Sequence, residues 1–394
     1  MAAQVALSLV LLVDMSLAVL SLRNARRVDP GFDPHGVVVA SFAPGLQGYS
    51  PAEAASFSRR LTERVRELPG IESAALASHL PLSIEITFDR VAPVDTIATA
   101  ASPDRWPSVD SARVGPGYFE TLRIPLVRGR TFTDDDRAGS PLVAVVNQSF
   151  AARFWTGEEA VGQRLRIAGA AADSEVVGVV RDGKYRTLGE SPRPFLYRVL
   201  EQTRGRSGHT GEITSGTMTL VARHRDPAAA ALVDLRREIR ALDARIAVSR
   251  LETFEETLGI ALFLPRMAAV LFAVFGLLGL LLAALGIYSL MVYTVGQRRR
   301  EIGIRMALGA TRRDIERLIV RRGLGLALLG IAAGLAAAAA TTRALTALLY
   351  GVSPTDGATF FGVALFLALV ALAASFLPAR RAARTGVVEA LRDR

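Results

Sequence analysis

Apolar runs and polar stretches alternate along the chain in a pattern that predicts four membrane-spanning helices. The first run is residues 1–22, where Asp14 is the one charged residue. Three uncharged runs follow near the other end, at residues 267–296, 323–342 and 357–379. Each run has at least 20 residues, and about 20 helical residues cross the ~30 Å hydrocarbon core of a bilayer. We therefore expect one N-terminal and three C-terminal transmembrane helices.

The polar residues 28–262 predict one large α+β domain between the first and second spans. Ser50, Pro51 and Glu53 form a capping box with proline at the first helical position, so a helix is expected to about Leu68. A second helix is expected from Pro227 to about residue 242. Short apolar runs predict strands at residues 73–78, 111–114, 142–146, 175–180 and 218–222.

Composition agrees with this mixed architecture. The mean hydropathy of +0.31 and the 51% share of hydrophobic residues are too high for an ordinary soluble chain and too low for one wholly in the membrane. Cysteine is absent, which excludes disulfides, thiolate catalysis and zinc–thiolate sites. The four histidines are scattered without ligand spacing. We expect no catalytic residues, no bound cofactor and no metal site.

Basic residues gather beside the spans. Residues 298–322 hold nine arginines and three acidic residues, within a net charge of +10. Because positive loops stay inside, this segment and the tail at residues 380–394 are expected in the cytoplasm, and residues 28–262 outside. Arg23, Arg26 and Arg27 oppose this orientation but are fewer. Such charges fit anionic lipid, and no nucleic-acid partner is expected.

The basic segment at residues 297–322 predicts a helix, a turn and a second helix. Gly309 supplies a stop, and Thr311 with Asp314 resembles a capping box that restarts the helix. From the residues alone, two interpretations are open. The segment is either a loop that only fixes topology, or an element that docks a cytoplasmic partner.

Five sequence stretches resemble a known family. R-R-R-E-I-G-I-R-M-A-L-G-A at residues 298–310 is similar to the loop between the second and third spans of FtsX-like (MacB-type) ABC transporter permeases. G-P-G-Y-F-E-T-L-R-I-P-L-V-R-G-R at 115–130, V-V-N-Q-S-F-A-A-R-F-W at 145–155 and V-V-G-V-V-R-D at 176–182 resemble the extracytoplasmic domain of the same family. The tail P-A-R-R-A-A-R at 378–384 also fits, although Thr385-Gly386-Val387 replaces the family's usual Asp-Pro.

The resemblance implies a permease of the inner (plasma) membrane, with its large domain outside, that works with a separate cytoplasmic ABC ATPase. That ATPase would bind the ATP, and the 297–322 segment would form the coupling helix that rests on it. The motif positions implied to contact the ATPase are Arg299, Glu301, Ile302, Gly303, Arg305, Met306, Gly309 and Ala310. Pairing as a homodimer or with a second permease half is also implied. The alternative function is a membrane-anchored scaffold that recruits an extracytoplasmic partner without transport.

Two motifs invite other interpretations. Residues 178–184 match a P-loop as far as Lys184, but Tyr185 stands where a Ser or Thr must hold magnesium. We interpret them as a strand and turn, so the chain is not expected to hydrolyse ATP by itself. Residues 134–136 are three aspartates without the spacing of a calcium loop, and a solvated turn or the start of a helix is expected there.

The predicted spans contain a glycine pattern and an acidic residue. Gly330 and Gly334 form a G-x-x-x-G pattern that predicts close helix packing. Asp14 is costly within a span, and we interpret it as tolerated rather than mechanistic. Residues 1–22 could also be a signal peptide, but no basic region precedes the apolar run. Because the chain begins directly with this run, we also expect it to be a fragment or second half of a longer permease.

Overall fold

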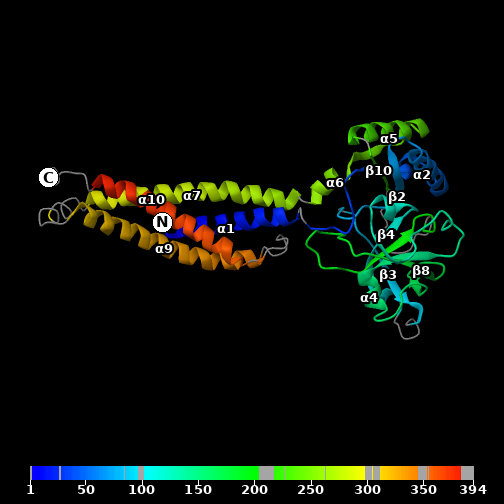
Figure 1. The fold of residues 1–394 in the computed structure, drawn as a ribbon, viewed down its shortest axis with the longest axis horizontal. Coiled ribbons are helices and arrows are strands. Elements are labelled where there is room, and N and C mark those ends of the chain that lie inside the picture. Colours follow the sequence, from blue (N-terminus) through cyan, green and yellow to red (C-terminus); the bar gives the residue numbers. More distant parts are fainter. Residues whose placement is uncertain are drawn as a thin grey trace. The chain divides into compact units, whose positions relative to one another are not determined.

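The computed structural model divides the chain into two compact units. One comprises residues 1–27 and 262–394, and the other residues 28–261; both are drawn in Figure 1. Within them, the structure describes residues 2–25, 28–83, 85–95, 102–203, 217–225, 227–261, 263–297, 304, 311–344, 353 and 355–382.

The first unit is a bundle of long helices, which are α1 (Ala2–Ala25), α7 (Phe263–Gln297), α9 (Arg312–Ala344) and α10 (Gly357–Ala382). Each contains a stretch long and apolar enough to cross a membrane, and these are the four such helices among the described residues. Helix α9 contains both the second helix of the basic segment and the third span, because Gly323 keeps a helical backbone and no proline intervenes.

The second unit is a mixed α/β domain. Its helices are α2 (Pro51–Arg66), α3 (Tyr118–Thr121), α4 (Gln148–Phe154), α5 (Ala228–Leu242) and α6 (Phe254–Ala261). Its strands are β1 (Val37–Phe42), β2 (Ile71–Ala77), β3 (Thr87–Pro93), β4 (Ser108–Val114), β5 (Leu126–Gly129), β6 (Val143–Asn147), β7 (Arg164–Ile167), β8 (Ser174–Val180), β9 (Phe195–Val199), β10 (Met218–His224) and β11 (Val248–Thr253). The expected fold class, four spans with a large α+β domain, is confirmed.

The first half of this domain is an open sheet in the order β11-β1-β10-β2, with all neighbours antiparallel. Helices α2 and α5 cover one face, where Phe57, Leu61 and Leu235 meet alternate strand residues such as Val38 (Figure 1). Val37 and the other alternate residues enter a second core on the opposite face. Both faces of β1 and β10 are therefore buried.

The second half closes on itself. The order runs β4-β3-β7-β8-β6-β9, and β9 then pairs in parallel with β4. A closed sheet has no exposed edges, and its interior holds Val146, Phe150 and Leu165. The two halves join where β2 pairs with β4, at the single residue pair Ala77 and Val114.

Local capping signals position the helices as expected. The Ser50 hydroxyl accepts from the Glu53 amide, and the Glu53 carboxylate accepts from the Ser50 amide at 2.8 Å. The side-chain oxygen of Asn147 accepts from the amides of Phe150 and Phe195, at 3.0 and 2.8 Å. Asn147 therefore caps α4 and also ties the helix to the start of β9.

The buried His79 makes this domain sensitive to acid. Its side chain is 6% exposed. Burial lowers its pKa from 6.5 to about 4, helped by the charge of Arg113 and opposed by Asp110. Between pH 6.5 and 4 the unfolded state therefore binds more protons than the folded state. We predict that the free energy of unfolding falls as pH drops through this window.

The measurement is thermal unfolding followed by tryptophan fluorescence, since Trp106 and Trp155 both lie in this domain. His79→Gln should flatten the dependence of the melting temperature on pH between 6.5 and 4. Identical slopes for the variant and the native protein would contradict the assignment.

Candidate functional site

The candidate site in the helix bundle is the contact of α1 with α7 and α9. A separate packed element in residues 28–261 joins the segment that follows α1 to the segment that precedes α7. Val5, Leu9 and Leu17 of α1 are buried in the helix bundle, against residues such as Ile287 of α7 and Ile331 of α9. Leu277 of α7, by contrast, is 57% exposed, as expected of a side chain that faces lipid. The first span is therefore the central packing element of the bundle.

Gly330 and Gly334 lie directly against α1. A Cβ atom on Gly330 would meet the carbonyl oxygen of Ala2 at 2.7 Å and the Cβ of Val5 at 2.8 Å. One on Gly334 would meet the carbonyl oxygen of Ala6 at 2.9 Å. These distances are below any ordinary carbon contact, so only glycine permits this approach. The G-x-x-x-G pattern therefore faces α1.

Glycines of α7 form the other contact with α1. A Cβ atom on Gly279 would lie 3.0 Å from the hydroxyl oxygen of Ser8, and one on Gly276 would lie 3.3 Å from Leu12. The Ser8 hydroxyl donates within its own helix, to the carbonyl of Gln4 at 2.8 Å. The α1–α7 contact thus uses close packing rather than an interhelical hydrogen bond from Ser8.

Asp14 turns into the bundle rather than toward lipid. Its side chain is 6% exposed, and its Oδ1 has no hydrogen-bond partner in the described part of the chain. Protein surroundings lower the cost of an acid within a span, compared with lipid. This placement agrees with an acid that the bundle tolerates, and it indicates no mechanistic role for Asp14.

From Thr311 onward the basic segment is described, and its residues from Arg312 form the beginning of α9. Thr311 donates to the Asp314 carboxylate from its amide at 3.0 Å and from its hydroxyl at 2.6 Å. These hydrogen bonds lower the pKa of the Asp314 carboxyl, which is therefore ionised at the positive N-terminal end of the helix dipole. The eight predicted ATPase-contacting residues, from Arg299 to Ala310, lie outside the described residues.

The segment after α1 is fastened to the segment before α7. Phe32 stacks on Phe254, with ring centroids 5.5 Å apart, and the imidazole of His35 pairs with the Glu255 carboxylate. Next to them in sequence, strands β1 and β11 are neighbours, with Val38 paired to residue 253. The two chain segments that connect the domain to α1 and α7 are thus one packed element.

Arg223 of β10 holds the same element from inside the domain. Its side chain is 5% exposed, and its guanidinium donates to the carbonyls of His35 at 2.7 Å, Asp33 at 2.8 Å and Thr121 at 2.8 Å. Burial lowers the pKa of Arg223, with a further contribution from Arg123. An arginine nevertheless stays charged. Sequence reasoning missed Arg223, since nothing local marks it as buried.

The other sequence candidates have structural roles. Gly178 lies in β8, and no helix follows residues 178–184. The Lys184 ammonium donates to the Glu190 carbonyl, and Tyr185 stacks on Phe195 with centroids 3.7 Å apart. The solvated turn expected at residues 134–136 is wrong for Asp136, which is buried and paired with Arg130 at 2.7 Å. Within the described ranges, no three His, Cys, Asp or Glu side chains gather as metal ligands.

Comparison with known proteins decides the family. Residues 14–238 match the family model of the MacB-like periplasmic core domain, and residues 273–387 match that of the FtsX-like permease C-terminal region. The chain belongs to the FtsX-like permease family with a MacB-like periplasmic core domain. It is therefore a multi-pass protein of the inner membrane with its large domain outside the cytoplasm.

Curated relatives agree with this assignment. The permease is 30% identical over 292 residues to a pyoverdine export ATP-binding/permease protein, PvdT, of Pseudomonas putida, covering 70% of this chain and 41% of the relative. It is 28% identical over 341 residues to a macrolide export ATP-binding/permease protein, MacB, of Sodalis glossinidius, covering 82% and 49%. The ABC transporter permease YknZ of Bacillus subtilis is 25% identical, with coverage of 71% and 68%. The chain spans about half the length of the first two relatives.

Among solved structures, the periplasmic region of MacB from Actinobacillus actinomycetemcomitans is similar to 56% of this chain and 91% of that chain, with 16% identity and a TM-score of 0.35.

The glycine contacts predict that a larger side chain destabilises the bundle only at positions that touch α1. Gly334→Leu should separate α1 from α9 and destabilise the bundle by roughly 1–3 kcal/mol, the usual cost of overpacking. Gly325→Leu, in the same helix, is the matched control, because a Cβ at Gly325 meets nothing within 4 Å. Thermal loss of helical circular dichroism in detergent measures both. Equal destabilisation by the two variants would contradict the packing assignment.

Removing the Arg223 side chain should loosen the packed element. Arg223→Met leaves three carbonyl acceptors unpaired, so we predict a loss of roughly 3 kcal/mol in the stability of the domain. Arg225 follows the same strand, β10, and forms an exposed ion pair with Glu72. Arg225→Gln removes this pair and should lower the stability of the domain by less than about 1 kcal/mol. Tryptophan fluorescence during thermal unfolding compares them, and similar losses would refute the special role of Arg223.

Proposed function

We propose that this permease is the membrane subunit of an ABC exporter. In this proposal, it transmits motion from an ATPase at the cytoplasmic segment 297–322 to the extracytoplasmic domain. Membership of the FtsX-like family supports the proposal, as do the names of PvdT and MacB, which describe export and combine ATP-binding with permease. The substrate class follows from none of these similarities.

One structural observation carries the transmission step. Helix α9 runs unbroken for 33 residues, about 50 Å, from the basic segment through the membrane. It contacts α1 where Gly330 and Gly334 exclude any side chain. A displacement at Arg312 therefore has a closely packed route within the bundle, from α9 to α1. In the extracytoplasmic domain, the segment that follows α1 in the chain is packed with the segment that precedes α7 through Phe32 and Phe254.

The motor in this proposal is an ATPase outside these 394 residues. Residues 178–184, which resemble a P-loop in part, end a strand and enter a loop that packs against Phe195 through Tyr185. We propose that ATP binds to the partner ATPase and that this chain needs no cofactor of its own. We also propose pairing with a second copy or a second permease half, within lipid, and an extracytoplasmic protein partner.

The coupling residues remain those that the sequence motif assigns. Residues 299–310 lie between the end of α7 and the cap of α9, and both helices belong to the packed bundle. A partner that moves this segment therefore acts on two spans at once. Motion is transmitted only if the ATPase binds two arrangements of the permease with different affinity.

Charge reversal in this segment tests the proposal. We expect the double variant Glu301→Lys with Met306→Glu to lose co-purification of the ATPase and its stimulation by the permease at least tenfold, because a charged and an apolar contact are both replaced. Pull-down from solubilised membranes and ATP hydrolysis in nanodiscs measure the two properties.

Arg60→Glu is the matched control, since it reverses an exposed charge on the other side of the membrane and should change neither property. Unchanged ATPase binding and stimulation in the double variant would overturn the proposal. If the variant also retained a stable extracytoplasmic partner, the scaffold function would take its place.

A further inference from the structure

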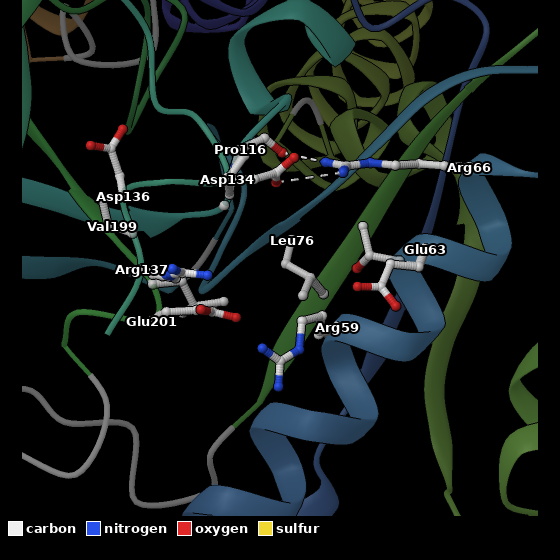
Figure 2. Close-up of a pocket in the computed structure, with 13 residues that line it drawn as sticks. Arg59, Glu63, Arg66, Leu76, Pro116, Asp134, Asp136, Arg137, Val199 and Glu201 are labelled. Carbon is white, nitrogen blue, oxygen red and sulfur yellow. Dashed lines mark hydrogen bonds and ion pairs between the residues drawn. The ribbon is translucent and has the colours of Figure 1, made fainter. Parts of the chain in front are cut away.

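A cavity of about 250 Å³ lies where the two halves of the extracytoplasmic domain meet. Figure 2 shows Arg59 and Glu63 on one side, along α2, and Arg137 and Glu201 on the other. The side chains of Leu76 and Val199, with Leu200, supply its apolar surface. The volume is slightly below the ~300–1,000 Å³ of pockets for drug-sized ligands, so it suits a small solute.

Part of the lining is structural and already satisfied. The Arg66 guanidinium donates to the carbonyls of Ala74 at 2.8 Å and Pro116 at 2.7 Å, and it lies 3.9 Å from Asp134. Asp136 receives two hydrogen bonds from Arg130, at 2.7 and 3.0 Å. These groups hold the walls in place and are not free to bind a ligand strongly.

The backbone around the cavity is equally fixed. Gly117 has a φ of +83°, and a Cβ there would approach the guanidinium of Arg66 to 3.1 Å. The carbonyl of Arg137 accepts from the amide and hydroxyl of Ser140, at 3.1 and 2.8 Å. The amide of Leu200 donates to the carbonyl of Val114 at 3.0 Å. The cavity is therefore formed by ordered turns before any ligand arrives.

Four charged side chains on the walls are unpaired. Arg59, Glu63, Arg137 and Glu201 have no side-chain hydrogen bond or ion pair with any other described residue. Each wall thus presents one free guanidinium and one free carboxylate across the apolar surface of Leu76. The arrangement has both signs of charge, at separate places, with an apolar contact between them.

This combination excludes simpler ligands. A divalent cation needs several oxygen ligands together, and no such acidic group occurs in the described part of the chain. A multiply charged anion would be repelled by Glu63 and Glu201 as much as it is attracted by the two arginines. An apolar solute would contact Leu76 but make no use of the four charged side chains, which water solvates.

We infer that the cavity binds a small zwitterionic solute of the amino-acid or short-peptide class. Its carboxylate lies against Arg59 and Arg137, its ammonium group against Glu63 and Glu201, and its apolar part on Leu76. Charge-assisted hydrogen bonds of this kind are about twice as strong as neutral ones. The side-chain chemistry of the cavity is complementary to both ends of such a molecule.

The position of the cavity gives binding a structural consequence. The wall with Arg59 and Glu63 belongs to the open half, whereas Glu201 follows β9 of the closed half. The direct sheet pairing of β2 with β4 is limited to Ala77 and Val114. A bound zwitterion therefore bridges the two halves where the sheet connects them least.

The test is titration calorimetry of the full chain in detergent with the dipeptide alanyl-leucine, whose termini are free. We expect saturable binding at millimolar concentration or below, and no binding of the same dipeptide with an acetylated amino end and an amidated carboxyl end. Arg59→Ala and Glu63→Ala should each weaken binding by about tenfold or more, the loss of one charge-assisted hydrogen bond.

Arg60→Ala is the matched control, because it removes an exposed arginine that does not line the cavity; it should bind as the native protein does. Thermal unfolding verifies that each variant is folded. Failure of the free dipeptide to bind, equal binding of the blocked dipeptide, or binding unchanged in Arg59→Ala and Glu63→Ala would each overturn the inference. None of these outcomes depends on an ATPase.

Discussion

The close approach of α1 to α7 and α9 is the constraint on which the membrane part of this permease depends. Lipid gives helices little hydrophobic reason to associate, so van der Waals packing must hold them together. Here Gly279 of α7 and Gly330 and Gly334 of α9 bring both helices within contact of the α1 backbone or short side chains. Helix α1 therefore packs against both helices at once, which is the contact that the proposed transmission of motion uses.

In the extracytoplasmic domain, hydrogen bonds from a buried arginine and aromatic stacking take the place of helix packing. Arg223 binds three carbonyl groups with one buried guanidinium, and aromatic stacking joins Phe32 to Phe254. Within the domain, these contacts hold the segment after α1 against the segment before α7. Further away, the ladder between β2 and β4 that joins the open and closed halves of the sheet has one residue pair, and a shared hydrophobic core packs the two halves together.

Sequence patterns predicted the features that depend on neighbours in the chain. Uncharged runs marked the spans, and the capping box of Ser50 and Glu53 marked the start of α2. Strand β1 was not predicted, because all its residues are buried and its sequence therefore has no alternating pattern. Closure of the second half by β4 and β9, the burial of Arg223 and the pairing of Asp136 with Arg130 all join distant segments or depend on burial. Single-sequence periodicity carries no signal for them.

The most direct test of coupled motion is the distance between α1 and α9 through the ATPase cycle. The chain lacks cysteine, so Leu7→Cys with Arg313→Cys, both exposed positions, takes two spin labels specifically. Double electron–electron resonance then compares the nucleotide-free and ATP-analogue states with the ATPase bound. We predict the same distance in both states, because the two helices move as one body. A shift of about one helical turn, roughly 5 Å, would contradict the account.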